Sequence, residues 1–208
     1  QGQEVDVTTF HGFGLRIVRE WSEELGFRAG RIAVYSHDES CALMDELAEG
    51  LGIGQARWPP QELSAALERY RLGDPGMQIP EQLQLLAGAF DDTLRHRGAI
   101  DFAAMLALPL QLFTARPDVL RLYQDSYRHV LADEFQDVCA AQYTLLRLLA
   151  AQHRNLVVVG DPLQTLYGWR GADVRFLVDF QRDFPEAQVV SLDQNFRSTG
   201  RIVDLANA

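Results

Sequence analysis

Lysine is absent from this sequence: all 19 residues counted as lysine or arginine are arginines. A P-loop needs a lysine after its glycines to reach the β and γ phosphates of a nucleotide. No segment of the chain has that pattern in any register. The absence excludes a P-loop within these 208 residues.

Cysteines and long apolar runs are also scarce. Cys41 and Cys139 lie far apart and without metal-site spacing, which favours reduced thiols in the cytoplasm over a disulfide. The five histidines show no paired spacing that would indicate zinc. The longest apolar runs, residues 105–110 and 156–159, are far too short to span a bilayer, and the first residues have no signal-peptide pattern. We therefore expect a cytoplasmic protein with no membrane partner.

The charge balance argues against nucleic-acid binding on composition alone. The formal net charge is −10, and residues 37–127 carry seven arginines against fourteen acidic residues. Proteins that bind polyanions usually show the opposite balance. The hydrophobic fraction of 47% is enough for a well-buried core. Any DNA-binding hypothesis therefore depends on particular residues.

Apolar periodicity and turn residues divide the chain into three regions. In the first, residues 5–8 alternate like a short strand, Thr9 is placed to cap a helix, and residues 10–25 repeat at helical spacing. The middle region predicts only helices, and Pro109 is expected to end or kink one of them. These helices are predicted over residues 38–51, 60–72, 79–97, 101–114 and 117–127.

The third region predicts alternating strands and helices. The strands are predicted over residues 129–132, 156–159 and 188–192. The helices are predicted over residues 140–152, 174–184 and from 199 onward. Such alternation is typical of an α/β fold with a mostly parallel sheet covered by helices. Sheets of this kind bind ligands at the carboxyl ends of their strands, so we expect the functional site there.

The segment LADEFQD, residues 131–137, is the strongest local signal. A buried strand delivers Asp133 and Glu134 to its exposed end, where successive side chains point to opposite sides. One carboxylate can hold hydrated Mg²⁺ while the other takes a proton from an attacking water. The alternative is a strand that leaves the core through a polar, capped turn.

Two further polar segments follow predicted strands. Gln164, in VGDPLQ at residues 159–164, can contact a γ-phosphate or orient water, unless the segment is an ordinary Asp-Pro turn. Arg197, in QNFRS at residues 194–198, can reach a transferred phosphate, unless it is a helix-start residue in a surface ion pair.

An aromatic loop offers a contact for nucleic acid. Tyr167, Trp169 and Arg170 lie in a glycine-flanked loop that suits stacking on unpaired bases and contact with phosphate. The alternative is a tryptophan that fills a hydrophobic seam. His11 lies at the predicted strand-to-helix junction and is more simply a capping or core histidine than a ligand.

In their order and spacing, these segments resemble the UvrD/Rep/PcrA family of superfamily 1 DNA helicases. The resemblance spans nearly the whole chain, and the run YGWRGA at residues 167–172 is highly specific. It rests on TFHG (9–12), WPP (58–60), DFA (101–103), DEFQD (133–137), GDPLQTLYGWRGA (160–172) and QNFRS (194–198).

The resemblance implies a fold and a motor. Residues 1–36 and 128–198 would form part of a RecA-like domain with a parallel sheet (domain 1A), and residues 37–127 an all-helical insertion (domain 1B). Residues 199–208 would begin a second RecA-like domain. The intact protein would be an ATP-dependent helicase that moves 3′ to 5′ on single-stranded and duplex DNA, in DNA repair or replication.

The resemblance also implies residue roles at the nucleotide. Asp133 would bind Mg²⁺ and Glu134 would activate water. Gln164 and Arg197 would contact the γ-phosphate of ATP, and Phe196 would stack on adenine, where the family usually has tyrosine.

On the DNA side, Tyr167, Trp169 and Arg170 would contact the single strand, with His11 on the same path.

The resemblance has gaps. The P-loop and most of the second RecA-like domain are absent, so we expect an internal fragment that binds neither ATP nor Mg²⁺ and is inactive as an ATPase. Removing the P-loop strand would expose apolar strand edges, which favour dimerisation. Two alternatives remain. One is a non-motor module that binds DNA or a protein on the same scaffold. The other is part of a helicase-nuclease, indicated only by Asp161 and Pro162.

Overall fold

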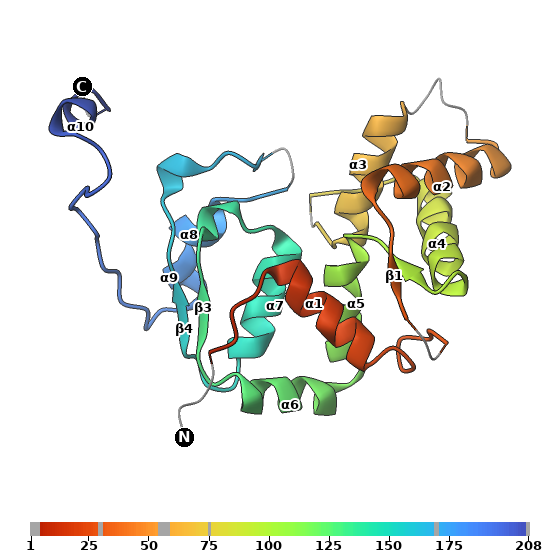
Figure 1. Ribbon diagram of the computed structural model, residues 1–208, viewed down its shortest axis with the longest axis horizontal. Helices are drawn as coiled ribbons and strands as arrows, with labels where there is room; N and C mark the ends of the chain where they lie inside the picture. Colours follow the sequence, from red (N-terminus) through yellow and green to blue (C-terminus); the bar gives the residue numbers. More distant parts are fainter. Residues whose placement is uncertain (1–4, 29–30, 54–58, 75, 169–170, 207–208) are drawn as a thin grey trace.

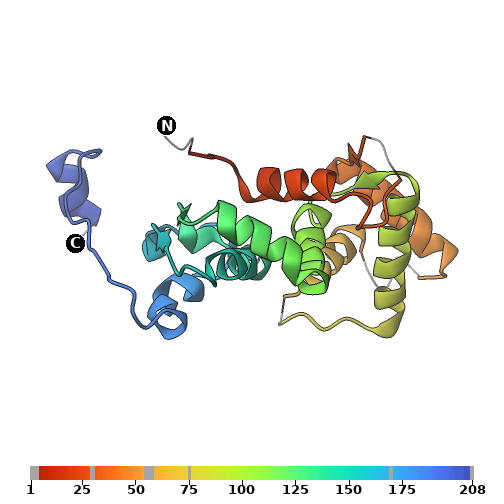
Figure 2. The ribbon, with the colours of Figure 1, turned by 90° about the horizontal axis from the view of Figure 1, so that it is seen from below.

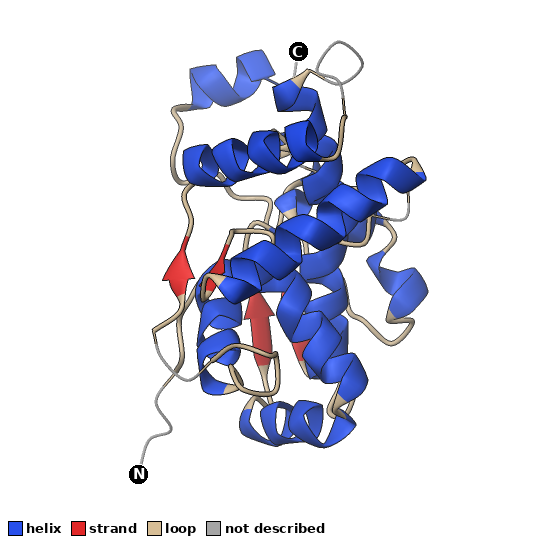
Figure 3. Ribbon diagram, turned by 90° about the vertical axis from the view of Figure 1, so that its right-hand side faces the viewer, coloured by secondary structure: helices blue, strands red, loops and turns tan. Residues whose placement is uncertain are grey.

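The computed structural model describes residues 5–28, 31–53, 59–74, 76–168 and 171–206 (Figure 1). Helices dominate this part of the chain, and its strands are short (Figure 3). The elements are, in chain order, α1 (Phe10–Glu20), β1 (Ala33–Val34), α2 (His37–Gly50), α3 (Pro60–Arg71), α4 (Glu81–His96), β2 (Ala99–Ile100), α5 (Ala104–Ala115), α6 (Pro117–Ser126), β3 (Val130–Ala132), the 3₁₀ turn η1 (Phe135–Asp137), α7 (Ala140–Ala150), β4 (Leu156–Val158), the 3₁₀ turn η2 (Pro162–Gln164), α8 (Arg175–Val178), α9 (Phe180–Asp183) and α10 (Gly200–Ala206).

Helices α2, α3 and α4 enclose a core of their own, at the right of Figure 1. Leu67, Leu86 and Phe90 are fully buried at its centre. A capping box starts α2: the hydroxyl of Ser36 accepts a hydrogen bond from the N–H of Glu39 at 3.3 Å, and the Glu39 carboxylate accepts one from the N–H of Ser36 at 2.7 Å. This cap explains why α2 begins close to its predicted start.

Helices α5 and α6 pack with α1 and α7 instead, around a second core that includes Ile17 and Phe113. Helix α1 meets α5 at Gly14, where a Cβ atom would lie 1.8 Å from the carbonyl oxygen of Met105. Pro109 has no N–H to donate to that carbonyl, yet α5 does not end there. The carbonyl of Met105, which receives no hydrogen bond from Pro109, therefore faces Gly14. Glycine has no Cβ atom, and this allows α1 to approach α5 so closely.

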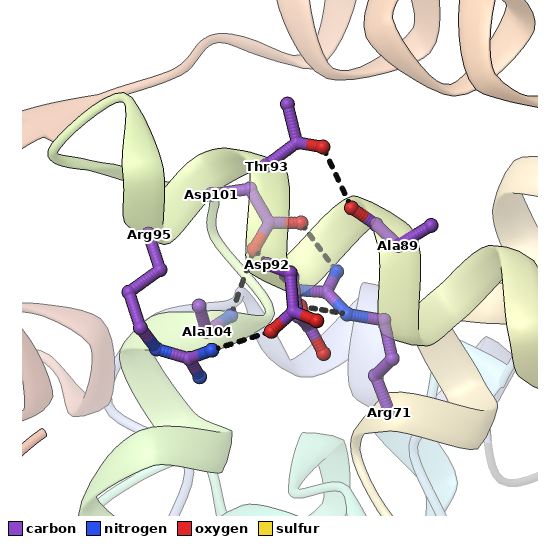
Figure 4. A network of polar contacts seen from close by, with 8 residues as sticks. Arg71, Ala89, Asp92, Thr93, Arg95, Asp101 and Ala104 are labelled. Carbon is purple, nitrogen blue, oxygen red and sulfur yellow. Dashed lines mark hydrogen bonds and ion pairs between the residues drawn. The ribbon is translucent and has the colours of Figure 1, made fainter. Parts of the chain in front are cut away.

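A buried ion-pair cluster joins these two groups of helices (Figure 4). Arg71 donates to both carboxylate oxygens of Asp101, at 2.6 and 2.9 Å, and to Asp91 at 2.9 Å. Its guanidinium also lies 4.9 Å from the ring centre of Phe90, and Asp101 caps α5 by accepting from the N–H of Ala104 at 3.0 Å. Burial lowers the pKa of Arg71, but the hydrogen bonds and charge of Asp101, then of Asp91, hold that pKa above its ordinary value.

Strands β3 and β4 pair in parallel, with Val130 opposite Leu156 and Ala132 opposite Val158. One face of this pair packs against α7 and the short helices α8 and α9. The other face is open, since Leu131, Val157 and Val159 are 74%, 53% and 48% exposed. The parallel pairing predicted for this region is confirmed, and its carboxyl ends present the predicted polar segments.

Several predicted elements are wrong. Residues 5–8 and 188–192 lie outside any strand, and residues 174–184 form two short helices rather than one. A strand requires a partner that completes its ladder of hydrogen bonds, and an alternating pattern alone does not supply one. Conversely, β2 lies in the region predicted to be wholly helical, where it pairs in parallel with β1. A two-residue strand is too short to produce a periodicity.

Two absences predicted from the sequence can be compared with the structure. Cys41 and Cys139 are both free. Among the described residues, no helix is long and apolar enough to cross a bilayer.

Candidate active site

The acidic pair lies at the carboxyl end of β3. Two backbone hydrogen bonds fasten the turn to β4: the N–H of Val159 donates to the carbonyl of Ala132, and that of Phe135 to the carbonyl of Val159, both at 2.9 Å. Glu134 has φ 50° and ψ 42°, a left-handed conformation that is uncommon without glycine. The buried ring of Phe135 anchors the turn, and it leaves the side chains of Asp133 and Glu134 exposed.

The second polar turn follows β4. Asp161 caps η2: its Oδ1 accepts from the N–H of Leu163 at 2.9 Å, and its Oδ2 accepts from Nε2 of Gln164 at 2.8 Å. The hydrogen bond from Gln164, and then that from Leu163, lower the pKa of Asp161 below its ordinary value. The Gln164 side chain is exposed and held in place by this carboxylate.

Gln136 brings the two turns together, a role not predicted from the sequence. Its Nε2 donates to Oε2 of Glu134 at 2.7 Å, and its Oε1 accepts from the N–H of Asp161 at 3.1 Å. The side chain is 1% exposed. Buried amides need hydrogen-bond partners. The sequence signal for such a bridge is a glutamine that directly follows two acidic residues and a phenylalanine at the end of a predicted strand.

The aromatic loop continues from η2. Tyr167 is 44% exposed, and its carbonyl accepts from the N–H of Ala172 at 3.3 Å. A positive φ of 86° at Gly171 closes the loop, which reaches back to Cys139 through an antiparallel bridge. Trp169 and Arg170, both predicted to contact DNA, lie outside the described residues.

His11 lies in the first turn of α1, which Thr9 caps by accepting from the N–H of Gly12 at 3.0 Å. Burial lowers the pKa of His11, so its imidazole is neutral at pH 7. Its ring meets the ring of Phe102 edge to face, with centroids 5.7 Å apart. Phe102 is 52% exposed, and this half-open aromatic was not among the predicted contact residues.

Phe196 and Arg197 lie in a separate segment. Residues 188–199 lead away from β3 and β4 toward α10, as Figures 1 and 2 both show. Asn195 orders the turn there by accepting from the N–H groups of Arg197 and Ser198, both at 2.9 Å, and Phe196 is 87% exposed. Among the described residues, no hydrogen bond or ion pair joins Arg197 to Glu134 or Gln164. Their grouping around one nucleotide stays a prediction.

The donor set at the end of β3 fits hydrated Mg²⁺. Oδ1 of Asp133 accepts from the N–H of Glu134 at 2.9 Å, and the exposed carboxylate keeps capacity for a cation. Mg²⁺ retains several waters and takes one or two carboxylates together with substrate phosphates. The described residues contain no group of three or more His, Cys, Asp or Glu side chains that could hold a metal ion.

The acidic tip is exposed, since Asp133 and Glu134 both lie at the surface. Two cavities of about 450 Å³ each lie elsewhere, one beside Arg71 and one between α7 and α8. A ligand at the acidic tip would therefore need further surfaces to enclose it.

The chain is similar to a known family and to several curated proteins. Residues 1–185 match the family described as "UvrD/REP helicase N-terminal domain". The sequence is 32% identical, over 217 aligned positions, to "ATP-dependent DNA helicase PcrA" of Leuconostoc citreum, covering 99% of this chain and 29% of the relative. Proteins of the same name from Staphylococcus epidermidis and Staphylococcus aureus are also 32% identical, with 100% of this chain and 30% of each relative covered. The chain thus spans about 30% of the length of these relatives.

Proposed function

Since this chain belongs to the UvrD/REP helicase family, we propose that it is a segment of an ATP-driven DNA helicase and supplies the acidic part of the ATPase site. The observation that carries the proposal is the pairing of Asp133 and Glu134, at the end of β3, with the Asp161–Gln164 turn at the end of β4. Adjacent parallel strands bring such groups to one edge, where ligands of these sheets bind.

At this edge the two carboxylates take different tasks. Asp133 would hold Mg²⁺, which would supply charge stabilisation to the phosphates. Glu134 has one oxygen, Oε2, engaged by Gln136, which leaves Oε1 to accept a proton from water. Gln164 donates to the γ-phosphate through the second N–H of its Nε2, which Asp161 does not hold. Arg197 reaches the same phosphate and Phe196 stacks on adenine once further parts of the protein close over the edge.

The DNA path runs over the other predicted residues. Tyr167, Trp169 and Arg170 meet the single strand through stacking and phosphate contact. We add Phe102 to His11 on this path, because the two rings touch and Phe102 is half-exposed.

The packing of the helices supports a shorter helical insertion than the sequence resemblance implies. The core of α2, α3 and α4 is separate, whereas α5 and α6 pack on α1 and α7. We place the helical insertion (domain 1B) between about residues 35 and 100, and α5 and α6 in the partial RecA-like domain 1A, with a second RecA-like domain beginning near α10.

Other features of the motor follow from the family. The whole protein acts in the cytoplasm, moves 3′ to 5′ and serves DNA repair or replication. The 208-residue chain alone is inactive as an ATPase, because it has no lysine for a P-loop. The open face of β3 and β4 favours dimerisation of this chain in isolation.

The test uses a full-length protein that carries this sequence. Glu134→Gln is expected to lower DNA-stimulated ATP hydrolysis by about a hundredfold or more, since it removes the general base while retaining shape. Binding of a labelled ATP analogue should persist. The matched control is Glu23→Gln, an exposed glutamate in the turn after α1, which should leave hydrolysis unchanged.

Two outcomes would count against the proposal. Equal hydrolysis by Glu134→Gln and the wild type would remove Glu134 from the reaction. Salt-dependent binding of single-stranded DNA without any ATPase would favour the non-motor module, the second function that the missing lysine leaves open.

A further inference from the structure

Gln136 is one of few polar residues that the fold buries. Within the described residues, the buried polar or charged side chains are Ser40, Asp101, Gln124 and Gln136. Gln136 is the most deeply buried of these, at 1% exposure, and it uses both ends of its amide. The donor end binds Glu134 and the acceptor end binds the N–H of Asp161.

The bridge continues to Gln164. From the carboxylate of Glu134, hydrogen bonds of 2.7, 3.1 and 2.8 Å lead through Gln136 and Asp161 to the amide of Gln164. The two ends of this path are exposed, Asp161 is half-buried and Gln136 is buried. A buried, satisfied amide holds its neighbours more firmly than solvent-exposed contacts do.

Gly160 leaves the space that the bridge needs. A Cβ atom at this position would lie 2.7 Å from Oε1 of Gln136 and 3.2 Å from its backbone nitrogen. The φ angle of Gly160 is not in the positive range, so backbone conformation does not require glycine here. The requirement is for room beside Gln136 and also beside Leu177, whose Cδ2 would lie 3.1 Å from the added Cβ atom.

We propose that Gln136 is a positioning residue that sets the orientation of Glu134 and ties it to the Asp161–Gln164 turn. The inference rests on the proposed function, in which Glu134 is the general base and Gln164 contacts the γ-phosphate. The hydrogen bond from Gln136 holds Oε2, which fixes the orientation of the carboxylate and leaves Oε1 to accept a proton from water. A change at Gln164 when nucleotide binds is then transmitted to Glu134 through this chain of hydrogen bonds, whose central residue, Gln136, is buried.

The first measurement is independent of catalysis. In Gln136→Met of the full-length protein, the N–H of Asp161 loses its acceptor, and its hydrogen exchange should accelerate by about tenfold. Gly160→Ala should accelerate the same amide, because it displaces Oε1 of Gln136. Unchanged exchange at Asp161 in both variants would overturn the bridge.

The second measurement is steady-state kinetics. Both variants should lower kcat for DNA-stimulated ATP hydrolysis by about ten- to a hundredfold, as loss of a supporting residue commonly does. The KM for ATP should change by less than about twofold, because Gln136 touches no substrate. Combining Gln136→Met with Gly160→Ala should add little, since both break the same bridge.

Matched controls separate positioning from general damage. Gln124→Met removes another buried glutamine, whose Nε2 donates to the carbonyl of Leu148 at 2.7 Å in a different part of the fold. Gly88→Ala, within α4, adds a methyl group with no atom within 4 Å. Both should leave the exchange of Asp161 and the ratio of kcat to KM near wild type.

The outcomes also separate this inference from the proposed function. An active wild type whose kcat is insensitive to Gln136→Met overturns the positioning role and leaves the helicase proposal standing. A wild type without ATPase activity, but with faster Asp161 exchange in the variant, overturns the proposed function while supporting the bridge.

Discussion

Two small polar networks in this molecule are both built around carboxylates but have different surroundings. In the Arg71 cluster, the arginine and Asp101 side chains are 5% and 11% exposed, and the guanidinium faces carboxylates and an aromatic ring. At the tips of β3 and β4, Glu134 and Gln164 are exposed and each is held by one partner. The buried network is satisfied and joins helices. In the exposed network, a carboxylate oxygen of Glu134 and an N–H of Gln164 stay available to bind a ligand. The candidate site therefore differs from the scaffold in its unused hydrogen-bonding groups rather than in its density of charge.

The largest expected loss of stability comes from breaking the buried network. Arg71→Met leaves Asp101 without its cation in a buried position, which we expect to cost about 3–5 kcal/mol in the free energy of unfolding. Urea denaturation of the variant and the wild type measures this directly.

Arg69→Met is the matched control on the same helix. Arg69 pairs with Asp74 at 2.7 Å, but its side chain is 45% exposed, so we expect a loss of at most about 1 kcal/mol. Equal losses for the two arginines would contradict the contrast between buried and exposed networks.

The next largest loss of stability is expected at the contact between α1 and α5. Gly14→Ala would place a methyl group 1.8 Å from the carbonyl oxygen of Met105, and separating α1 from α5 should cost about 1–3 kcal/mol. Gly88→Ala, within α4, meets no atom within 4 Å and should instead stabilise by about 0.5–1 kcal/mol. Thermal unfolding of both variants checks the pair, and a stabilised Gly14→Ala would show that the helices do not meet as described.

The features that the sequence predicted correctly are those that depend on neighbouring residues. Local signals predicted well: Thr9 caps α1, and the runs before Asp133 and Asp161 form strands. Each of these depends on residues a few positions apart.

Features that depend on distant partners were missed. The pairing of β1 with β2 needs residues 33–34 and 99–100, and no local pattern encodes it. Residues 188–192 have strand-like composition without a neighbouring strand to pair with among the described residues. The bridging role of Gln136 was not predicted from the sequence, because its partner Asp161 lies 25 positions away.

The smallest effect is a pH dependence at the exposed network. The hydrogen bonds from Gln164 and Leu163 lower the pKa of Asp161 below its ordinary value of 3.8. The ionised carboxylate therefore contributes its full stabilisation of the turn at pH values above 3.8. That contribution is lost only as the pH falls through the lower pKa of the folded state. The Leu163 N–H and the Gln164 side-chain amide should therefore report, by NMR, a titration with a midpoint below 3.8. Asp161→Asn should abolish it. A midpoint above 3.8 would mean that Asp161 does not hold Gln164, and the exposed network would then lack the order that a site for a phosphate requires.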